Sequence, residues 1–173
     1  MDVGAGCDDP RKESNSLLFE ERGWNGIAID MDPFRLLGRK CKCYSCMIGD
    51  GSNRTETLGQ ILISNNCPKV VDYLSIDLEG MDLIAVKSFV ESGFRFKVAT
   101  IEHNLYSGNP GVSDLKRNIC SFLEANGYVK IVDNAGHMAT LGSLQRGYPF
   151  EDWYIDPKVV NHAMTVEKLG DKR

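Results

Sequence analysis

The chain opens on Asp2-Val3-Gly4-Ala5-Gly6, a short apolar stretch that breaks at two glycines. This pattern predicts a buried strand that runs into a tight turn, because glycine adopts backbone conformations that other residues avoid and allows a ligand to approach closely. A Gly-x-Gly turn is a weak functional signal by itself. Its meaning depends on the elements that follow it.

Strands alternate with helices along the rest of the chain. Apolar runs and turn residues predict further strands at 27–30, 40–48, 70–76, 96–101, 128–132 and 153–155. Helices are expected in the intervals after Ser16, Asp32, Glu56, Gly80 and Val112. This order predicts an α/β fold, a doubly wound and mostly parallel sheet of seven strands with an antiparallel strand near the end. We expect a single domain over residues 1–173, with a polar tail from about residue 157.

Composition excludes several classes of protein. The 173 residues carry a net charge of −4, which argues against a broad nucleic-acid-binding face. No apolar run reaches the roughly 20 residues that span a bilayer, and the six cysteines are too sparse for a disulfide scaffold. We therefore expect a cytoplasmic protein with a small-molecule partner and no membrane partner; a homo-oligomer stays open. Because the first strand starts at residue 1 or 2, we expect either a minimal protein or a fragment that lacks an upstream helix.

Three acids follow predicted strands: Asp30, Asp50 and Asp77. Ligands of open α/β sheets bind at the carboxyl ends of strands, and an acid after the second strand bonds ribose hydroxyls. A dinucleotide would place its pyrophosphate at the turn after Gly6, but Cys7-Asp8-Asp9 stands there and would repel it. The sulfonium and amino groups of S-adenosylmethionine are cationic and would favour the same acids.

The chain resembles the FkbM-type methyltransferases over nearly its whole length. The matching segments are Asp2–Gly6, Ser14-Asn15-Ser16, Gly23–Asp30, Asp72–Gly80, Ile101-Glu102-His103-Asn104 and Asp152-Trp153-Tyr154. The resemblance implies a Rossmann-like class I methyltransferase fold and S-adenosylmethionine-dependent methylation, usually at an oxygen atom.

The resemblance also implies roles for individual residues. Asp2, Gly4 and Gly6 would lie beneath the methionine portion of the cofactor, and Ser14, Asn15 and Ser16 beside it. Asp30 would hold the ribose, although the family commonly has Glu there. Met31 would pack against adenine, and Asp50 would bond the adenine amino group. The cofactor lining would be completed by Ala5, Asp77 and Leu78.

The candidate reacting groups follow the fourth and fifth strands: Asp77, Glu79, Glu102, His103 and Asn104. Methylation of a hydroxyl needs a base or a metal. His103 is a candidate base, since imidazole titrates near neutral pH. Alternatively, Asp77, Glu102 and Asn104 could hold Mg²⁺ through oxygen atoms, as in catechol-type O-methyltransferases. In the simpler interpretation, His103 is structural and Glu79 caps a helix.

Other clusters carry weaker signals. Cys41, Cys43 and Cys46 could suggest zinc, but buried strand cysteines are the better interpretation because no second pair exists. Several aromatic residues could line an acceptor pocket or could only cover the edge of the sheet: Tyr106, Tyr148, Phe150, Trp153 and Tyr154.

The favoured hypothesis is an O-methyltransferase that acts on a small molecule or saccharide. Two alternatives remain open. A nucleic-acid ribose 2′-O-methyltransferase would need a catalytic lysine, for which Lys87 and Lys97 are candidates. A cofactor-binding partner subunit would have no activity of its own.

Overall fold

A computed structural model describes residues 1–6, 14–141 and 144–160, with the backbone alone for Tyr106 and for 137–141 and 144–147. The elements are β1 (Asp2–Val3), α2 (Leu17–Glu21), β2 (Ile27–Asp30), η1 (Pro33–Leu36), β3 (Lys42–Ser45), α3 (Leu58–Ser64), β4 (Val70–Ile76), α4 (Asp82–Glu91), β5 (Arg95–Glu102), η2 (Leu105–Ser107), α5 (Pro110–Ala125), β6 (Val129–Leu141) and β7 (Leu144–Ile155). The predicted tail from about residue 157 lies mostly outside these residues.

The strands form one seven-stranded sheet in the order β3-β2-β1-β4-β5-β7-β6. The strands β3, β2, β1, β4 and β5 are parallel to one another, whereas β7 runs antiparallel to β5 and to β6. The α/β class and the late antiparallel strand are therefore confirmed. From β1 the chain winds first to β2 and β3 on one side and later to β4 and β5 on the other. The strand order thus reverses between β1 and β4, which is where open α/β sheets bind ligands.

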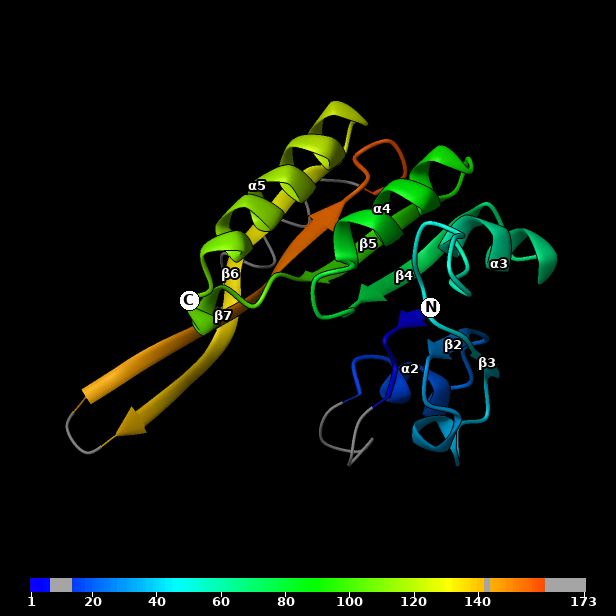
Figure 1. Cartoon of the computed structure of the whole chain (residues 1–173), viewed down its shortest axis with the longest axis horizontal. Helices are drawn as coiled ribbons and strands as arrows, with labels where there is room; N and C mark the ends of the chain where they lie inside the picture. Colours follow the sequence, from blue (N-terminus) through cyan, green and yellow to red (C-terminus); the bar gives the residue numbers. More distant parts are fainter. Residues whose placement is uncertain (7–13, 142–143, 161–173) are drawn as a thin grey trace.

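One face of the sheet is covered by α3, α4 and α5, which lie in a row (Figure 1). Their apolar side chains include Leu62, Phe89 and Leu123, which belong to the same buried core as Ile29 and Ile76 of the sheet. Such burial contributes about 1.5–3 kcal/mol for each large apolar side chain. This layer fixes the strands whose ends form the site.

The other face is covered by the short α2 and η1. Phe19 of α2 packs on Tyr73 of β4 with ring centroids 4.9 Å apart, and Leu36 of η1 packs on Ala5 and Ala28. A helix was expected from Pro33 through Leu37; the structure has a 3-10 turn over Pro33–Leu36, opened by Asp32, whose side chain accepts a hydrogen bond from Phe34 N. Gly38 follows in a left-handed conformation (φ 84°) and ends it.

The last two strands are longer than the predicted 128–132 and 153–155. In β7, only Glu151–Ile155 pair with β5, while 144–149 pair with β6 alone and form an arm that extends beyond the sheet (Figure 1). Sequence periodicity missed this arm because its residues show no alternation of apolar and polar side chains. Strand β3, by contrast, is shorter than the predicted 40–48. No helix in the described residues is long and apolar enough to cross a bilayer.

Candidate active site

A cleft of about 520 Å³ opens at the carboxyl ends of β1, β2 and β4, at the reversal of strand order. Small-molecule sites fall in the range of about 300–1,000 Å³. Its described lining consists of Gly4, Gly6, Ile29, Asp30, Met31, Asp32, Arg35, Cys46, Met47, Ile48, Asp77, Leu78, Glu79 and Met81. Six residues predicted to contact a cofactor are among them: Gly4, Gly6, Asp30, Met31, Asp77 and Leu78.

Close packing where the strand order reverses requires glycine at both positions of the first turn, Gly4 and Gly6. A Cβ atom at Gly4 (φ 77°) would lie 1.7 Å from the Asp77 carbonyl oxygen, and one at Gly6 would lie 2.6 Å from Asp30 Oδ2. Gly4 therefore lets β1 run against the end of β4. Gly6 lets the turn pass over the Asp30 carboxylate.

Asp30 is held by the backbone on both sides. Gly6 N donates to Oδ2 and Asp32 N donates to Oδ1, each at 2.8 Å. A carboxylate has about four acceptor positions, so two remain for a ligand. The backbone thus orients the carboxylate while leaving it able to bind hydroxyl groups.

The rest of the cleft combines apolar and acidic side chains. Met31 and Met47 are 67% and 50% exposed at its edge, and Ile48 is buried beneath. Exposed methionines around a concavity provide an adaptable apolar surface for a ligand. The charged lining consists of the acids Asp30, Asp32, Asp77 and Glu79 and one cation, Arg35. This balance favours a cationic or neutral ligand over a pyrophosphate.

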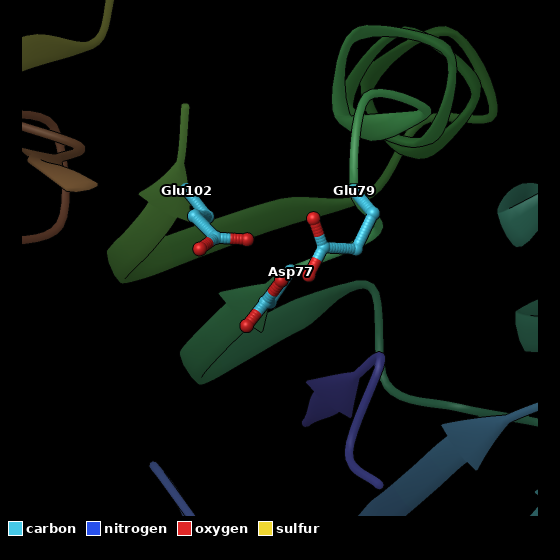
Figure 2. A group of neighbouring side chains, drawn as sticks. All are labelled: Asp77, Glu79 and Glu102. Atoms are coloured by element: carbon cyan, nitrogen blue, oxygen red, sulfur yellow. The ribbon is translucent and has the colours of Figure 1, made fainter. Parts of the chain in front are cut away.

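Three carboxylates meet beside the cleft. Asp77 follows β4, Glu102 ends β5, and Glu79 comes from the turn before α4; their side chains point toward one another (Figure 2), with ligand atoms within 4.8 Å. We call these three residues the acid cluster. It is the only group of at least three potential metal ligands in the described part of the chain.

The neighbouring carboxylates of the acid cluster disfavour the charged form of Glu102. Burial, a hydrogen bond shared with Asp77 and the charges of Asp77 and Glu79 raise the pKa of Glu102 to about 10. Glu102 Oε2 is buried without a hydrogen-bond partner among the described residues. Glu102 is therefore protonated at neutral pH unless a cation replaces the proton.

Two left-handed residues place Glu79 in the acid cluster. Glu79 has φ 51°, and its turn is held by buried Asp82, which accepts hydrogen bonds from Leu78 N and Gly80 N at 2.8 and 2.9 Å. Burial raises the pKa of Asp82 to about 6, against the lowering effect of these bonds. Asn104 (φ 50°) donates its amide to Glu79 Oε2 at 3.1 Å. Asn104 was predicted to be a metal ligand. In the structure it orients Glu79, and Glu79 is the third potential ligand beside Asp77 and Glu102.

His103 does not have the surroundings of a general base. It is buried, its Nδ1 accepts a hydrogen bond from Leu105 N at 3.2 Å, and its Nε2 faces Asp152 Oδ1 at 3.3 Å. Nε2 lies within ion-pair distance of Asp152 but has no hydrogen-bond partner among the described residues. Both ring nitrogens are thus directed into the protein. The structural interpretation of His103 is the one that this geometry favours.

Asp152 is the centre of a buried charge network behind the acid cluster. Burial alone would raise its pKa, but His103, the Asn134 N–H and the cations Lys116 and Lys130 hold the pKa of this carboxyl well below its usual range. The network joins β5, α5, β6 and β7. It fixes the end of β5, where Glu102 stands.

Several residues predicted to bind the cofactor lie elsewhere. Asp2 is buried below the cleft, where it accepts from Ser16 Oγ at 2.6 Å and pairs with Arg39 at 3.5 Å. Asn15 donates to Ser75 Oγ of β4 at 3.0 Å. In each case a short side chain satisfies a buried polar group of the sheet instead of a ligand. The remaining two do not line the cleft either: Ser14 accepts from Ser16 N and Leu17 N, and Ala5 packs on η1.

Asp50 is also outside the cleft. It is exposed and accepts hydrogen bonds from the backbone and side chain of Ser52, at 2.9 and 2.6 Å. The chain turns away after β3, which ends at Ser45 and not at Ile48 as predicted, so Asp50 does not stand at a strand end. Cys7-Asp8-Asp9 lies outside the described residues.

The weaker sequence signals do not converge on a site. Cys43 is exposed and Cys41 and Cys46 are only partly buried, so the prediction of buried cysteines is wrong. Tyr154 is fully buried, with its hydroxyl directed to Asp152, because it belongs to the core. None of the other predicted aromatic residues with described side chains, Tyr148, Phe150 and Trp153, lines the cleft. Lys97 pairs with Asp72 and Lys87 lies over the Phe122 ring, both away from the acid cluster.

The chain matches no family of known proteins, no curated protein and no solved structure.

Proposed function

We propose that the chain is an S-adenosylmethionine-dependent methyltransferase that methylates a hydroxyl group of a small molecule or saccharide. The observation that carries the proposal is the cleft at the reversal of strand order, which Asp30, the Gly4–Gly6 turn and two members of the acid cluster line together. A nucleoside site and a group of candidate proton acceptors thus meet in one concavity.

The lining fits the parts of S-adenosylmethionine one by one. Asp30, oriented by two backbone N–H groups, would accept hydrogen bonds from the ribose hydroxyls. Met31, Met47 and Ile48 would enclose the adenine ring. The acids near Gly4 and Gly6 would favour the positive charge of the sulfonium and amino groups. The sheet, mostly parallel with an antiparallel strand near its end, agrees with the methyltransferase fold that the sequence resemblance implies.

If bound there, S-adenosylmethionine would supply a methyl group for the acceptor oxygen, with its sulfur keeping the electron pair of the broken C–S bond, and Asp77 or Glu79 would receive the hydroxyl proton. The chain's part is to orient the acceptor hydroxyl and to receive this proton in the acid cluster. Proximity of the reacting groups accounts for much of the rate in reactions of this type.

The same cluster supports a role for Mg²⁺. Carboxylate oxygens are the ligands that this cation prefers, and Asp77, Glu79 and Glu102 would hold it in place of the proton on Glu102. The cation would lower the pKa of an acceptor hydroxyl bound to it.

Calorimetric titration with S-adenosylmethionine tests the proposal. We expect saturable binding that Asp30→Asn weakens by about ten- to a hundredfold, since hydrogen bonds to a charged group contribute about 1.5–3 kcal/mol. Asp50→Asn is the matched control and should bind like the wild type, because Asp50 lies outside the cleft. Absence of binding at saturating ligand, or tighter binding of NAD, would overturn the proposal. Binding without formation of S-adenosylhomocysteine in the presence of acceptors would identify a cofactor-binding subunit instead.

A further inference from the structure

A second cavity, of about 430 Å³, opens next to the acid cluster, between the turn that precedes α4, η2 and the first turn of α5. Its described lining consists of Glu79, Gly80, Asp82, His103, Asn104, Ser107, Asn109, Gly111, Val112 and Leu115. Glu79 is the one described residue that lines both this cavity and the cleft. A ligand in the second cavity would therefore contact Glu79 of the acid cluster, which the proposed nucleoside site also contacts.

One side of the second cavity carries uncharged hydrogen-bonding groups. Asn104 Oδ1 is buried and has no hydrogen-bond partner among the described residues. Ser107 Oγ accepts from Asn109 N at 3.3 Å, which leaves its hydroxyl hydrogen to be donated. Asn109 Oδ1 accepts from Gly111 N at 3.2 Å, which leaves its NH₂ group. The cavity thus offers both acceptors and donors to hydroxyl groups.

The other side of the cavity is apolar. Val112 and Leu115 stand three positions apart on α5, which puts them on one face of the helix, and both are half-buried. A ligand with one flat C–H face and a rim of hydroxyls would satisfy both sides.

Charge excludes an anionic ligand. Glu79 and Asp82 line the cavity, and no Lys or Arg is among its described lining residues. The positive end of α5 offers little compensation, because Pro110 has no N–H and Asn109 already caps Gly111 N. A phosphate or carboxylate would meet carboxylates without a cation.

We propose that this cavity binds the methyl acceptor and that the acceptor is a neutral pyranose ring, stacked on Val112 and Leu115 with its hydroxyls on Ser107, Asn109 and Asn104. Asn104, which also holds Glu79 through its amide, would place one hydroxyl at the acid cluster. This inference rests on the proposed function for its chemistry and on the second cavity for its ligand.

Backbone amide NMR tests the ligand. We would titrate the chain, saturated with S-adenosylhomocysteine, with methyl pyranosides of gluco, galacto, manno and rhamno configuration. At least one should shift the amides of 104–115, and glucose 6-phosphate should not. The proposal is overturned if no pyranoside shifts these amides, or if the phosphate shifts them more strongly.

A filled cavity tests the acceptor role. Val112→Trp should remove the pyranoside shifts and raise the acceptor KM by about tenfold or more, while calorimetric binding of S-adenosylmethionine is unchanged. Ser113→Trp, exposed and adjacent on the same helix, is the matched control and should leave both intact. If Val112→Trp turns over like the wild type, the acceptor lies elsewhere, although the methyltransferase proposal stands. If S-adenosylmethionine binds no variant, the proposed function itself fails, and any pyranoside shifts would mark a sugar site without methyl transfer.

Discussion

Replacement of Glu102 by Gln tests the charge of the acid cluster. Gln has the shape of a protonated Glu and cannot ionise. Because the pKa of Glu102 is raised to about 10, the folded chain keeps a proton that the unfolded chain, with a pKa of 4.5, releases. The folded state therefore binds more protons than the unfolded state between these two pKa values, and wild-type stability must fall as pH rises through this window.

The magnitude follows from proton linkage. One proton changes the free energy of unfolding by at most about 1.4 kcal/mol for each pH unit. Glu102 is only partly buried, so solvent screening reduces the effect, and we expect a loss of about 1 kcal/mol between about pH 6 and about pH 8. Glu102→Gln should not show this loss. Near about pH 8 it should be at least as stable as the wild type, although it removes a carboxylate.

Urea unfolding at several pH values, followed by circular dichroism, measures the difference. Glu91→Gln, at the exposed end of α4, is the control and should keep the wild-type pH dependence. Mg²⁺ should flatten the wild-type pH dependence, because the cation takes the place of the proton, and should leave Glu102→Gln unaffected. Parallel stability curves for the wild type and Glu102→Gln would refute the account of the acid cluster.

Two further substitutions test the scaffold of the site. Gly4→Ala should cost about 3 kcal/mol or more in urea unfolding, since its Cβ atom would overlap the Asp77 carbonyl and its φ is left-handed; Gly108→Ala, left-handed but with open space around it, should cost only about 1 kcal/mol. Equal costs for the two would contradict the close packing at the reversal point. Asp152→Asn should lower stability by about 2–3 kcal/mol near neutral pH, because it removes one of the two carboxylates that pair with Lys116 and Lys130 and leaves Asp133 as their remaining partner. Since the pKa of Asp152 is lowered in the folded chain, its contribution is present above about pH 4 and is lost as pH falls below that value, so the wild type and Asp152→Asn should converge in acid; a constant difference would contradict the prediction.

The sequence predicted the sheet and one wall of the cleft because both depend on local patterns. Val70–Ile76 is apolar enough to require burial, and the acids that follow such strands meet at one edge of a parallel sheet. Asp30 and Asp77 could be placed in this way, and so could Glu102. The sequence predicted a turn at Gly4. What requires glycine there is the close approach of the Asp77 backbone, which is distant in sequence and is seen only in the structure.

The remaining features depend on contacts between distant segments, for which the sequence gives no periodic signal. Met47 and Met81 line the cleft from two loops, and neither stands in a pattern. His103 follows a strand as a catalytic base would, yet Asp152 of β7 draws its imidazole into the protein. The resemblance implies that Ser16 and Asp2 lie against the cofactor. In the structure Ser16 donates its hydroxyl to the Asp2 carboxylate, and neither residue lines the cleft.

The central claim is that the methyl donor binds in the cleft between β1, β2 and β4. The most direct test is the backbone amide NMR spectrum of the chain during titration with S-adenosylhomocysteine. We expect progressive shifts of the Gly4, Gly6, Met31 and Leu78 amides, with those of Trp24 and Gly26 at the opposite end of the sheet unchanged. Shifts centred on Trp24 and Gly26, or a spectrum that does not change at saturating ligand, would contradict it.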